Sequence, residues 1–303
     1  MDFVTVCFKN DLPQMSLQAA SMDRFLKNFP VGKIIVILNE DTNEARSYFH
    51  ERVMPLYGHL IEQVILINHT AMTDHKILPC PHCKIRNRSC TYCYQQHLKL
   101  LGSRLVSSDF YCILDAKNWL TRDWKTRDIQ DDQGRLRISY DPGIDIQWKE
   151  HRKNSLAYYG FDDTEHTPVC GLTPFFVHTD IALSIVNDQI LIELWDRTPM
   201  TEFYLIEAAV LKKHGTVSAA YWKSRTFMNS IWPFTMEQLD MDAMIGEFIE
   251  PKQQTLVSGL HRRCYAMLTD KNRSDLIANY ARLGLLDQQK TQDLIDQMIA
   301  LNQ

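Results

Sequence analysis

Apolar residues fall into two kinds of block along the first third of the chain. The first kind is a short, nearly continuous apolar run, found at 3–8, 33–38, 61–67 and 110–114. The second kind has apolar residues at helical spacing among polar ones, found at 16–29, 42–57 and about 94–106. Continuous apolar strands that alternate with amphipathic helices predict an α/β fold, in which a mixed, mostly parallel sheet has helices on both faces.

The rest of the chain predicts shorter elements and a helical end. Charged residues, Trp and Pro are frequent over 120–180, which predicts loops and short strands that complete the sheet. Further helices are expected at about 179–195 and 201–213. Further strands are expected near 216–222 and 253–259. Apolar spacing over 270–303, with a break at Gly284, predicts a helical hairpin. We expect 1–269 to form one domain on which this hairpin packs.

Polar residues directly follow three of the predicted strands. In open parallel sheets, ligands bind beyond the carboxyl ends of the strands, so these polar residues should share one rim. They are Asn10 and Asp11, Asn39 and Glu40, and the segment Asp115–Asn118. Asp115 therefore ends a buried strand at the edge where a ligand is expected.

Length, charge and motifs narrow the functional class. With 303 residues, 45% of them hydrophobic and 23% charged, the chain can bury a large core. A net charge of −4 gives no global basic field for nucleic acid or anionic membrane. The N-terminal residues do not resemble a secretory signal, and no apolar stretch reaches the roughly 20 residues of a membrane helix. We expect a cytoplasmic protein without a membrane span; P-loop, nucleophile-elbow and zincin motifs are absent.

Four of the eight cysteines form a compact cluster. Cys80, Cys83, Cys90 and Cys93 make two Cys-x-x-Cys pairs separated by six residues. Each pair can direct two thiolates at one point, and two pairs complete a tetrahedral shell for Zn²⁺. Four protein ligands leave no open position on the metal. The predicted zinc is therefore structural, in an insertion that spans 70–94.

The segment between the two cysteine pairs, KIRNRS, carries three cations and no acid. In one interpretation, zinc stabilises an insertion too small for its own core, and the cations are its solvated surface. In the other, zinc presents the cations to a partner that carries phosphate, such as nucleic acid. Solvated charge runs are common, which favours the first interpretation.

Several segments together resemble a known family. The shared pattern is a Gln-Gln-x-Leu-Lys-Leu helix and then a strand that ends in Asp-x-Asp or Asp-x-Lys-Asn. The matching residues here are Gln95, Gln96, Leu98, Lys99, Leu100, Asp115, Lys117 and Asn118. Further matches are 4–25, 173–186, Glu202 within 201–211, and His261 within 259–265. These segments resemble a family of bacterial and phage glycosyltransferases with a GT-A-like fold, known mostly from genomes. The resemblance covers most of the chain except the zinc insertion.

The resemblance implies an enzyme that moves a sugar from a nucleotide-diphosphate sugar to a hydroxyl acceptor. In GT-A enzymes an Asp-x-Asp motif, often with a late histidine, binds Mn²⁺ or Mg²⁺ at the donor diphosphate. Asp115 and His261 are then candidate ligands of that cation. Asp115 and Glu202 are candidate catalytic residues, Glu202 as acceptor base or as a hydrogen-bond partner of the sugar. The candidate donor-binding residues are Asn10, Asp11, Gln95, Gln96, Lys99, Lys117, Asn118, His261 and Arg262.

The sequence departs from the Asp-x-Asp pattern at Lys117, which stands where the second acid would be. A protonated lysine cannot ligate a cation. Either Asp115 binds metal with His261, or Lys117 and Lys99 neutralise the phosphates directly. A third interpretation is a simple rim salt bridge between Lys117 and Asp115.

Three other candidates also have structural explanations. Glu202 stands at a predicted helix start, where a carboxylate often meets exposed N–H groups. His261 could be held by ordinary hydrogen bonds, and Asn10 or Asp11 could cap the following helix.

The acceptor is open among a glycan, a small molecule and a modified DNA base. An alternative function belongs to another class: a non-catalytic, zinc-dependent module that binds nucleic acid or protein, on a glycosyltransferase scaffold that has lost its activity.

Overall fold

The central sheet has five strands in the order β3–β2–β1–β4–β7. The computed structural model describes residues 1–39, 42–72, 90–139, 148–162, 169–190, 198–224, 226–233 and 241–302. The sheet strands are β1 (Asp2–Cys7), β2 (Ile34–Leu38), β3 (Val64–Asn68), β4 (Phe110–Asp115) and β7 (Phe175–His178). β1 to β4 pair in parallel, and β7 is antiparallel to β4. The predicted mixed, mostly parallel sheet is therefore confirmed.

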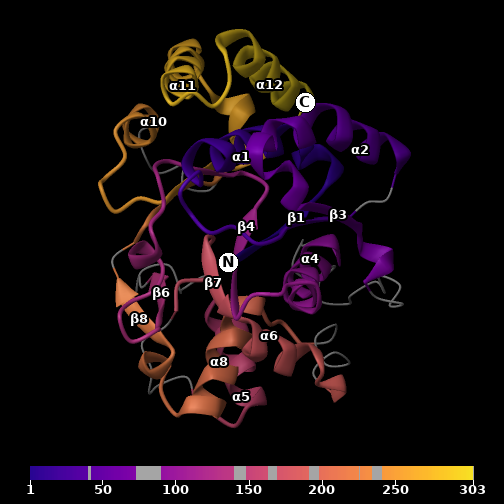
Figure 1. Cartoon of the computed structure of the whole chain (residues 1–303), viewed down its shortest axis with the longest axis vertical. Helices are drawn as coiled ribbons and strands as arrows, with labels where there is room; N and C mark the ends of the chain where they lie inside the picture. The colour runs from indigo at the N-terminus through magenta and orange to yellow at the C-terminus, as the bar shows by residue number, and fades with distance from the viewer. Residues whose placement is uncertain are drawn as a thin grey trace.

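Helices cover both faces of this sheet (Figure 1). One layer contains α1 (Leu12–Phe25), α2 (Asn43–Tyr48), α11 (Asp270–Arg282) and α12 (Gln288–Ala300). The other contains α4 (Cys90–Leu101), α5 (Lys149–Tyr158), α6 (Thr179–Val186) and α8 (Glu202–His214). No helix within the described ranges is both long and apolar enough to cross a membrane.

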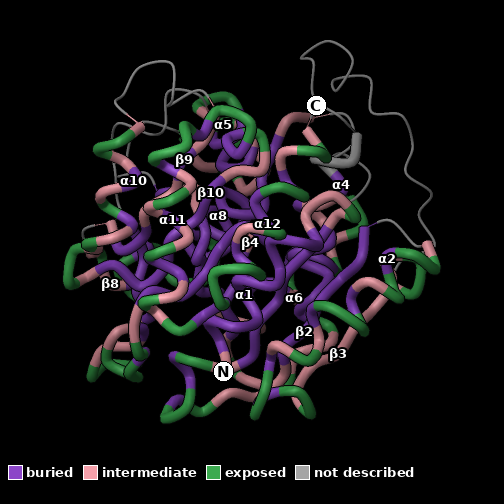
Figure 2. The backbone as a smooth tube through the Cα atoms, turned by 90° about the horizontal axis from the view of Figure 1, so that it is seen from above, coloured by how far each residue is buried: buried purple, intermediate pink, exposed green. Residues whose placement is uncertain are grey.

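Neighbouring residues of β1 face opposite layers, as strand geometry requires. Thr5 Oγ1 donates to Gln18 Oε1 of α1 at 2.9 Å. Val4 faces the other way, against Gly102 just after α4, where a Cβ would meet its Cγ1 at 2.7 Å. Figure 2 shows the resulting core as a buried interior that runs through the central strands and the inner helices. The continuous apolar strands of the sequence follow from this burial on both faces.

Two smaller sheets flank the central one. β5 (Asn118–Leu120), β10 (Val257–Leu260) and β9 (Met228–Ile231) form the first, and β6 (Leu136–Ser139) and β8 (Tyr221–Ser224) form the second. β10 is antiparallel to β5 and parallel to β9. The chain thus returns from a distant segment to lie beside the residues that follow β4.

The C-terminal hairpin is confirmed as α11 and α12, and Gly284 between them has a φ of 69°. That left-handed conformation favours glycine and ends α11 as the sequence predicts. α12 packs against α1 and against the 3₁₀ segment η9 (Arg262–Met267).

The single helix expected at 42–57 is wrong. α2 ends at Tyr48, a π-helical turn follows at Phe49–Val53, and a 3₁₀ segment, η3, covers Met54–Gln63. Gly58 interrupts η3 with a φ of 50°, and a Cβ there would lie 2.2 Å from an oxygen of Asp23. The sequence has the right apolar spacing, but Pro55, in the first turn of η3, has no backbone N–H with which to continue a regular helix.

Other boundaries also differ from those expected. α1 begins at Leu12 rather than at 16, and the segment expected as the start of strand 61–67 belongs to η3. α6 ends at Val186, well before the expected 195. Four helices or strands were not predicted: β5, α5, β9 and α10 (Met241–Ile249). α5 is strongly polar, and a buried ion pair between Arg152 and Glu207 of α8 holds it in place.

Candidate functional site

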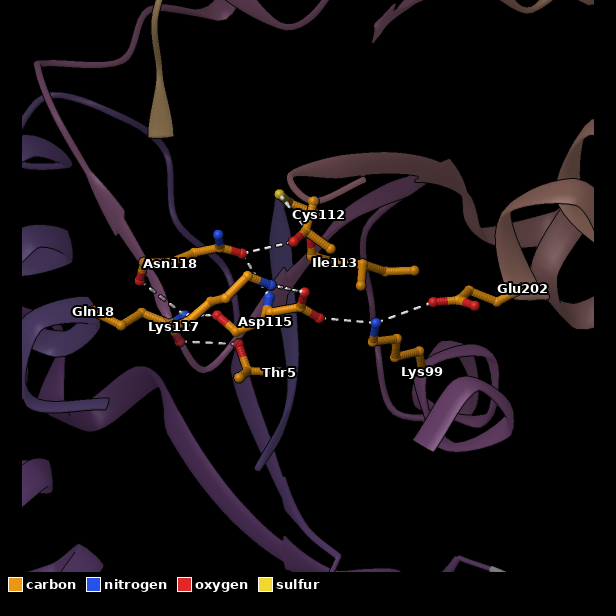
Figure 3. Close-up of polar contacts among 10 residues, drawn as sticks. Thr5, Gln18, Lys99, Cys112, Ile113, Asp115, Lys117, Asn118 and Glu202 are labelled. Carbon is orange, nitrogen blue, oxygen red and sulfur yellow. Dashed lines mark hydrogen bonds and ion pairs between the residues drawn. The ribbon is translucent and has the colours of Figure 1, made fainter. Parts of the chain in front are cut away.

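A tight turn joins β4 to β5 at the carboxyl end of the central sheet. Asp115 is the last residue of β4 and pairs with Val6 of β1. Asn118 Oδ1 accepts from the backbone N–H of Asp115 at 2.8 Å, which closes the turn. Gln18 of α1 donates to the backbone carbonyl of Asp115 at 2.9 Å (Figure 3). The turn is therefore held from inside the protein and not only by its own chain.

Strand alternation directs the side chain of Asp115 toward α4. Asp115 and Tyr111 are four residues apart, so they project from the same face of β4. The Tyr111 hydroxyl donates to the backbone carbonyl of Lys99 in α4 at 3.4 Å. On the same face, Lys99 Nζ lies 2.9 Å from Asp115 Oδ1. The expected grouping of Lys99 with Asp115 is thus present.

Lys99 also reaches a second carboxylate. Its Nζ donates to Glu202 Oε1 at 3.0 Å, so the ammonium lies between Asp115 and Glu202 (Figure 3). Glu202 occupies the first turn of α8, whose N-cap is Thr201, and its side chain is completely buried. The side-chain amide of Gln96, one helical turn before Lys99, faces both oxygens of Glu202, and with its oxygen and nitrogen exchanged it donates to them. Glu202 is therefore tied to α4.

Lys117 supplies the second cation at Asp115. Its Nζ donates to Asp115 Oδ2 and lies 4.1 Å from the ring centroid of Trp232, next to β9. The ring of Trp232 stacks on that of His261, with centroids 5.1 Å apart and planes 28° apart. The turn after β4 and the segment after β10 therefore meet through Trp232.

Burial and charge set the protonation of this cluster. Burial acts to raise the pKa of Asp115, but Lys117 and Lys99 outweigh it and hold that pKa well below the ordinary value. Burial lowers the pKa of Lys99, but Asp115 and Glu202 reverse this and raise it. For Glu202, burial dominates over Lys99, and the pKa is raised. For Lys117, burial dominates over Asp115, and the pKa is lowered.

His261 is neutral near pH 7. Burial first, and then the charges of Lys117, Arg262 and Arg263, lower its pKa to about 3. Its Nδ1 accepts from the backbone N–H of Arg263 at 3.3 Å, so one ring nitrogen caps η9. One of the alternatives for His261, a ring held by an ordinary hydrogen bond, therefore applies to Nδ1.

A separate ion pair lies at the carboxyl end of β1. Arg262 Nη1 donates to Asp11 Oδ1 at 3.1 Å. Asp11 precedes α1, but its side chain makes no capping hydrogen bond, so the expected cap is not formed by its carboxylate. Asn10, in the 3₁₀ segment Lys9–Asp11, and Gln95 of α4 are half-buried.

Two residues of this site were not predicted. Gln18 holds the turn, and its signal was a polar residue within the apolar pattern of a helix that packs on the sheet. Trp232 lies beside β9, a strand that is itself not predicted, so no local pattern places it next to Lys117.

The described side chains do not fit the expected divalent cation. Both oxygens of Asp115 face ammonium groups, and Lys117 stands in the position of the second acid. No three His, Cys, Asp or Glu side chains converge within the ranges the structure describes. Hard divalent cations need several oxygen ligands, and an ammonium beside each oxygen of Asp115 opposes such a shell.

The zinc site lies mostly outside the described residues. Cys80 and Cys83 are not described, and Cys90 and Cys93 are placed only by their backbone, in the first turns of α4. The other cysteines, Cys7, Cys112, Cys170 and Cys264, are buried, and none of these four is in a disulfide.

Substitution of Gly259 by alanine should disturb the packing of β10 against the turn that contains Lys117 and Asn118. Gly259 of β10 pairs with Asn118, and a Cβ there would lie 2.8 Å from Asn118 Nδ2 and 3.4 Å from Lys117 Cγ. We expect Gly259→Ala to lower the free energy of unfolding by about 1–3 kcal/mol through overpacking, measured by urea unfolding. Gly246→Ala in α10 is the control, because nothing lies within 4 Å of the added Cβ. Equal stability of the two variants would contradict the close packing at Asn118.

Comparison with known proteins gives a likeness in structure alone. No family model matches the chain, and no curated protein matches its sequence. The crystal structure of the galactosyltransferase LgtC with donor and acceptor sugar analogues covers 98% of this chain and 95% of its own, with a TM-score of 0.51 and 13% identity. An active-site mutant of LgtC, Q189E, covers 94% of this chain and 95% of its own, with a TM-score of 0.52 and 14% identity. Mouse xyloside xylosyltransferase 1 covers 86% of this chain and 97% of its own, with a TM-score of 0.47 and 9% identity. The chain therefore shares, over nearly its whole length, the fold of the glycosyltransferase LgtC.

Proposed function

We propose that the protein is a glycosyltransferase that uses a nucleotide-diphosphate sugar and a hydroxyl acceptor. The observation that carries the proposal is the pair of lysines that flank Asp115 at the carboxyl end of β4. In a mostly parallel sheet this edge is the usual ligand site. Two buried ammonium groups fixed there suit a ligand with closely spaced negative charge, as a diphosphate has.

In the proposed reaction, the bond between the anomeric carbon and the β-phosphate oxygen breaks, and the electron pair stays on that oxygen. The acceptor oxygen bonds to the anomeric carbon, and its proton passes to the leaving diphosphate, directly or through one water. Negative charge therefore grows on the leaving diphosphate, where a fixed cation stabilises the transition state more than the bound donor. Lys117 belongs to the turn between β4 and β5. Lys99 lies on α4, between Asp115 and Glu202.

The buried position of Glu202 opposes both of its expected roles, acceptor base and hydrogen-bond partner of the sugar, and supports a third. A base for the acceptor must reach the hydroxyl proton directly or through one water. Glu202 is completely buried and engaged by Lys99 and Gln96. We therefore propose that it positions Lys99, and through Lys99 Asp115. A role as acceptor base would require these contacts to break.

The remaining donor-binding candidates divide by their contacts. Asn118 shapes the turn, since its Oδ1 accepts from Asp115 N–H and from the Thr173 hydroxyl, both at 2.8 Å. Arg262 and Asp11 form an ion pair at the end of β1, where GT-A enzymes contact the nucleotide. We propose that Arg262 and the half-buried Asn10, Asp11 and Gln95 border the nucleotide, with His261 beside them.

A donor panel tests the proposed function. Thermal unfolding is measured with UDP-, GDP-, ADP-, CDP- and dTDP-sugars, and donor hydrolysis or transfer is followed for any sugar that stabilises the protein. We expect one nucleotide class to raise the melting temperature, because a ligand that binds only the folded state stabilises it. A chain that responds to no donor, yet binds DNA in a salt-sensitive way, would instead be the non-catalytic binding module. With the identified donor, the rate of sugar transfer is then compared among three acceptors: a glycan, a small molecule and a modified DNA base.

We also propose that Cys80, Cys83, Cys90 and Cys93 hold a structural zinc ion. The support is their spacing, as two Cys-x-x-Cys pairs. Elemental analysis of the purified protein should give about one zinc per chain, and Cys90→Ser should release it and lower the melting temperature. The same substitution at buried Cys112 is the control, since it should leave the zinc content unchanged. Normal stability of a zinc-free protein would contradict the assignment.

A further inference from the structure

On the basis of the proposed function, we infer that the ammonium of Lys117 takes the place of a divalent cation at the donor diphosphate, so that this protein binds its donor without metal. The side chains around Asp115 do not suit a divalent cation. Each oxygen of Asp115 already faces an ammonium group, from Lys99 on one side and Lys117 on the other. A divalent cation added at this carboxylate would meet both positive charges at short range.

Net charge explains how a lysine can do this work. Two carboxylates and one divalent cation sum to zero, since −2 and +2 cancel. Asp115 and Lys117 also sum to zero, since −1 and +1 cancel. Replacement of the second acid by a lysine thus removes the need for metal while it leaves the same net charge beside the diphosphate. The deeper pair, Lys99 and Glu202, is neutral as well and does not change this balance.

The position of Lys117 is fixed by three surrounding elements. Its backbone lies in the turn that Asn118 closes. Its stem lies against β10, where the Cβ position of Gly259 is 3.4 Å from Lys117 Cγ. Its ammonium lies between Asp115 and the face of Trp232, and the side chain is 7% exposed. A charge held in this way needs little reorganisation when the diphosphate arrives or leaves.

The ammonium also retains donor capacity. A lysine ammonium has three N–H groups. Among the described residues, Asp115 accepts one of them and the Trp232 ring faces the charge. A phosphate oxygen can accept a remaining N–H, which adds a charge-assisted hydrogen bond to the neutralisation.

Binding of nucleoside diphosphates tests the inference without reliance on turnover. UDP, GDP, ADP, CDP, dTDP and inorganic pyrophosphate are titrated by calorimetry into the full chain, once in MnCl₂ and once in EDTA at a concentration at which elemental analysis and circular dichroism show that the zinc content and the fold are retained. We expect the wild type to bind one nucleoside diphosphate with the same affinity in both buffers. Lys117→Met, which keeps the apolar stem, should weaken that binding by about 10–100-fold in both buffers.

Lys117→Asp provides the opposite arm, since it restores a second carboxylate two residues after Asp115. We expect it to bind the diphosphate weakly in EDTA and at least tenfold more tightly in MnCl₂. Electron paramagnetic resonance should detect bound Mn²⁺ in Lys117→Asp with the diphosphate, and none in the wild type. Circular dichroism checks that each variant is folded, and Lys117→Met alone decides the matter if Lys117→Asp does not fold.

The outcomes separate the inference from the function. A wild type that binds the diphosphate only with Mn²⁺ overturns the inference and leaves the glycosyltransferase in place. Full affinity of folded Lys117→Met in EDTA overturns it too, because the ammonium would then not be the counter-ion. Failure of the wild type to bind any nucleoside diphosphate in either buffer overturns the proposed function itself.

Discussion

Lys99→Met is expected to lower the free energy of unfolding by about 3–5 kcal/mol, as loss of one partner from a buried ion pair typically does. Lys99 is 4% exposed and contacts both Asp115 and Glu202. Its removal leaves Glu202 fully buried without its cation, whereas Asp115 keeps Lys117. Methionine has a similar length and fills the same space, so a packing defect contributes little. Urea unfolding followed by circular dichroism measures the loss.

The cost of Lys99→Met should shrink as the pH falls. Burial already raises the pKa of Glu202 above 4.5 in spite of Lys99, so removal of Lys99 raises it further. A carboxyl whose folded pKa lies above its unfolded pKa stabilises the fold while it is protonated, and this stabilisation is lost as the pH rises through the folded pKa. The variant should therefore be most destabilised at about pH 8 and less so at about pH 5.

Lys213→Met is the matched control. Lys213 pairs with Asp180, and their side chains are 48% and 62% exposed. Exposed pairs contribute about 0–1 kcal/mol, so this variant should remain close to the wild type at every pH. If Lys99→Met cost no more than Lys213→Met, the buried lysine would not be the counter-ion of Glu202.

Much of the central sheet can be predicted from the sequence, because local patterns encode it. β1, β2 and β4 are buried on both faces, so they appear as continuous apolar runs whose ends agree with the structure within one or two residues. α5 shows the limit of that approach. Its polar sequence has little amphipathic signal, and its stability depends on Arg152 and Glu207, which are 55 residues apart.

The site divides in the same way. Asp115 is predictable because a carboxylate directly follows a buried strand, and parallel strands present that end to ligands. The pairing of Glu202 with Lys99 cannot be predicted, since no pattern near either residue shows that they lie 3.0 Å apart. The pairing of Lys99 with Asp115, in contrast, agrees with two regularities of the sequence. Gln96 and Lys99 share one face of α4, and Tyr111 and Asp115 share one face of β4, so a helix packed on that face would bring Lys99 to Asp115.

Asp115→Asn should lower donor turnover by about 10²–10³-fold, the loss seen when one fixed electrostatic contact to a transition state is removed. The carboxylate balances two ammonium groups at once. An asparagine of the same shape offers one amide oxygen and one N–H donor, so one lysine would face a donor instead of an acceptor. The two cations would then repel, and Lys117 would move from its place beside the diphosphate.

Stability must be separated from turnover in this variant. Asp115 is 18% exposed, so its loss should also lower the free energy of unfolding, and turnover is therefore expressed per folded molecule from the unfolding curve at the same temperature. Asp180→Asn is the control, because it removes one charge of the exposed pair with Lys213 and should keep both turnover and stability near those of the wild type. Wild-type turnover by folded Asp115→Asn would mean that the lysines need no carboxylate to hold them, and the donor site would have to lie elsewhere along the sheet edge.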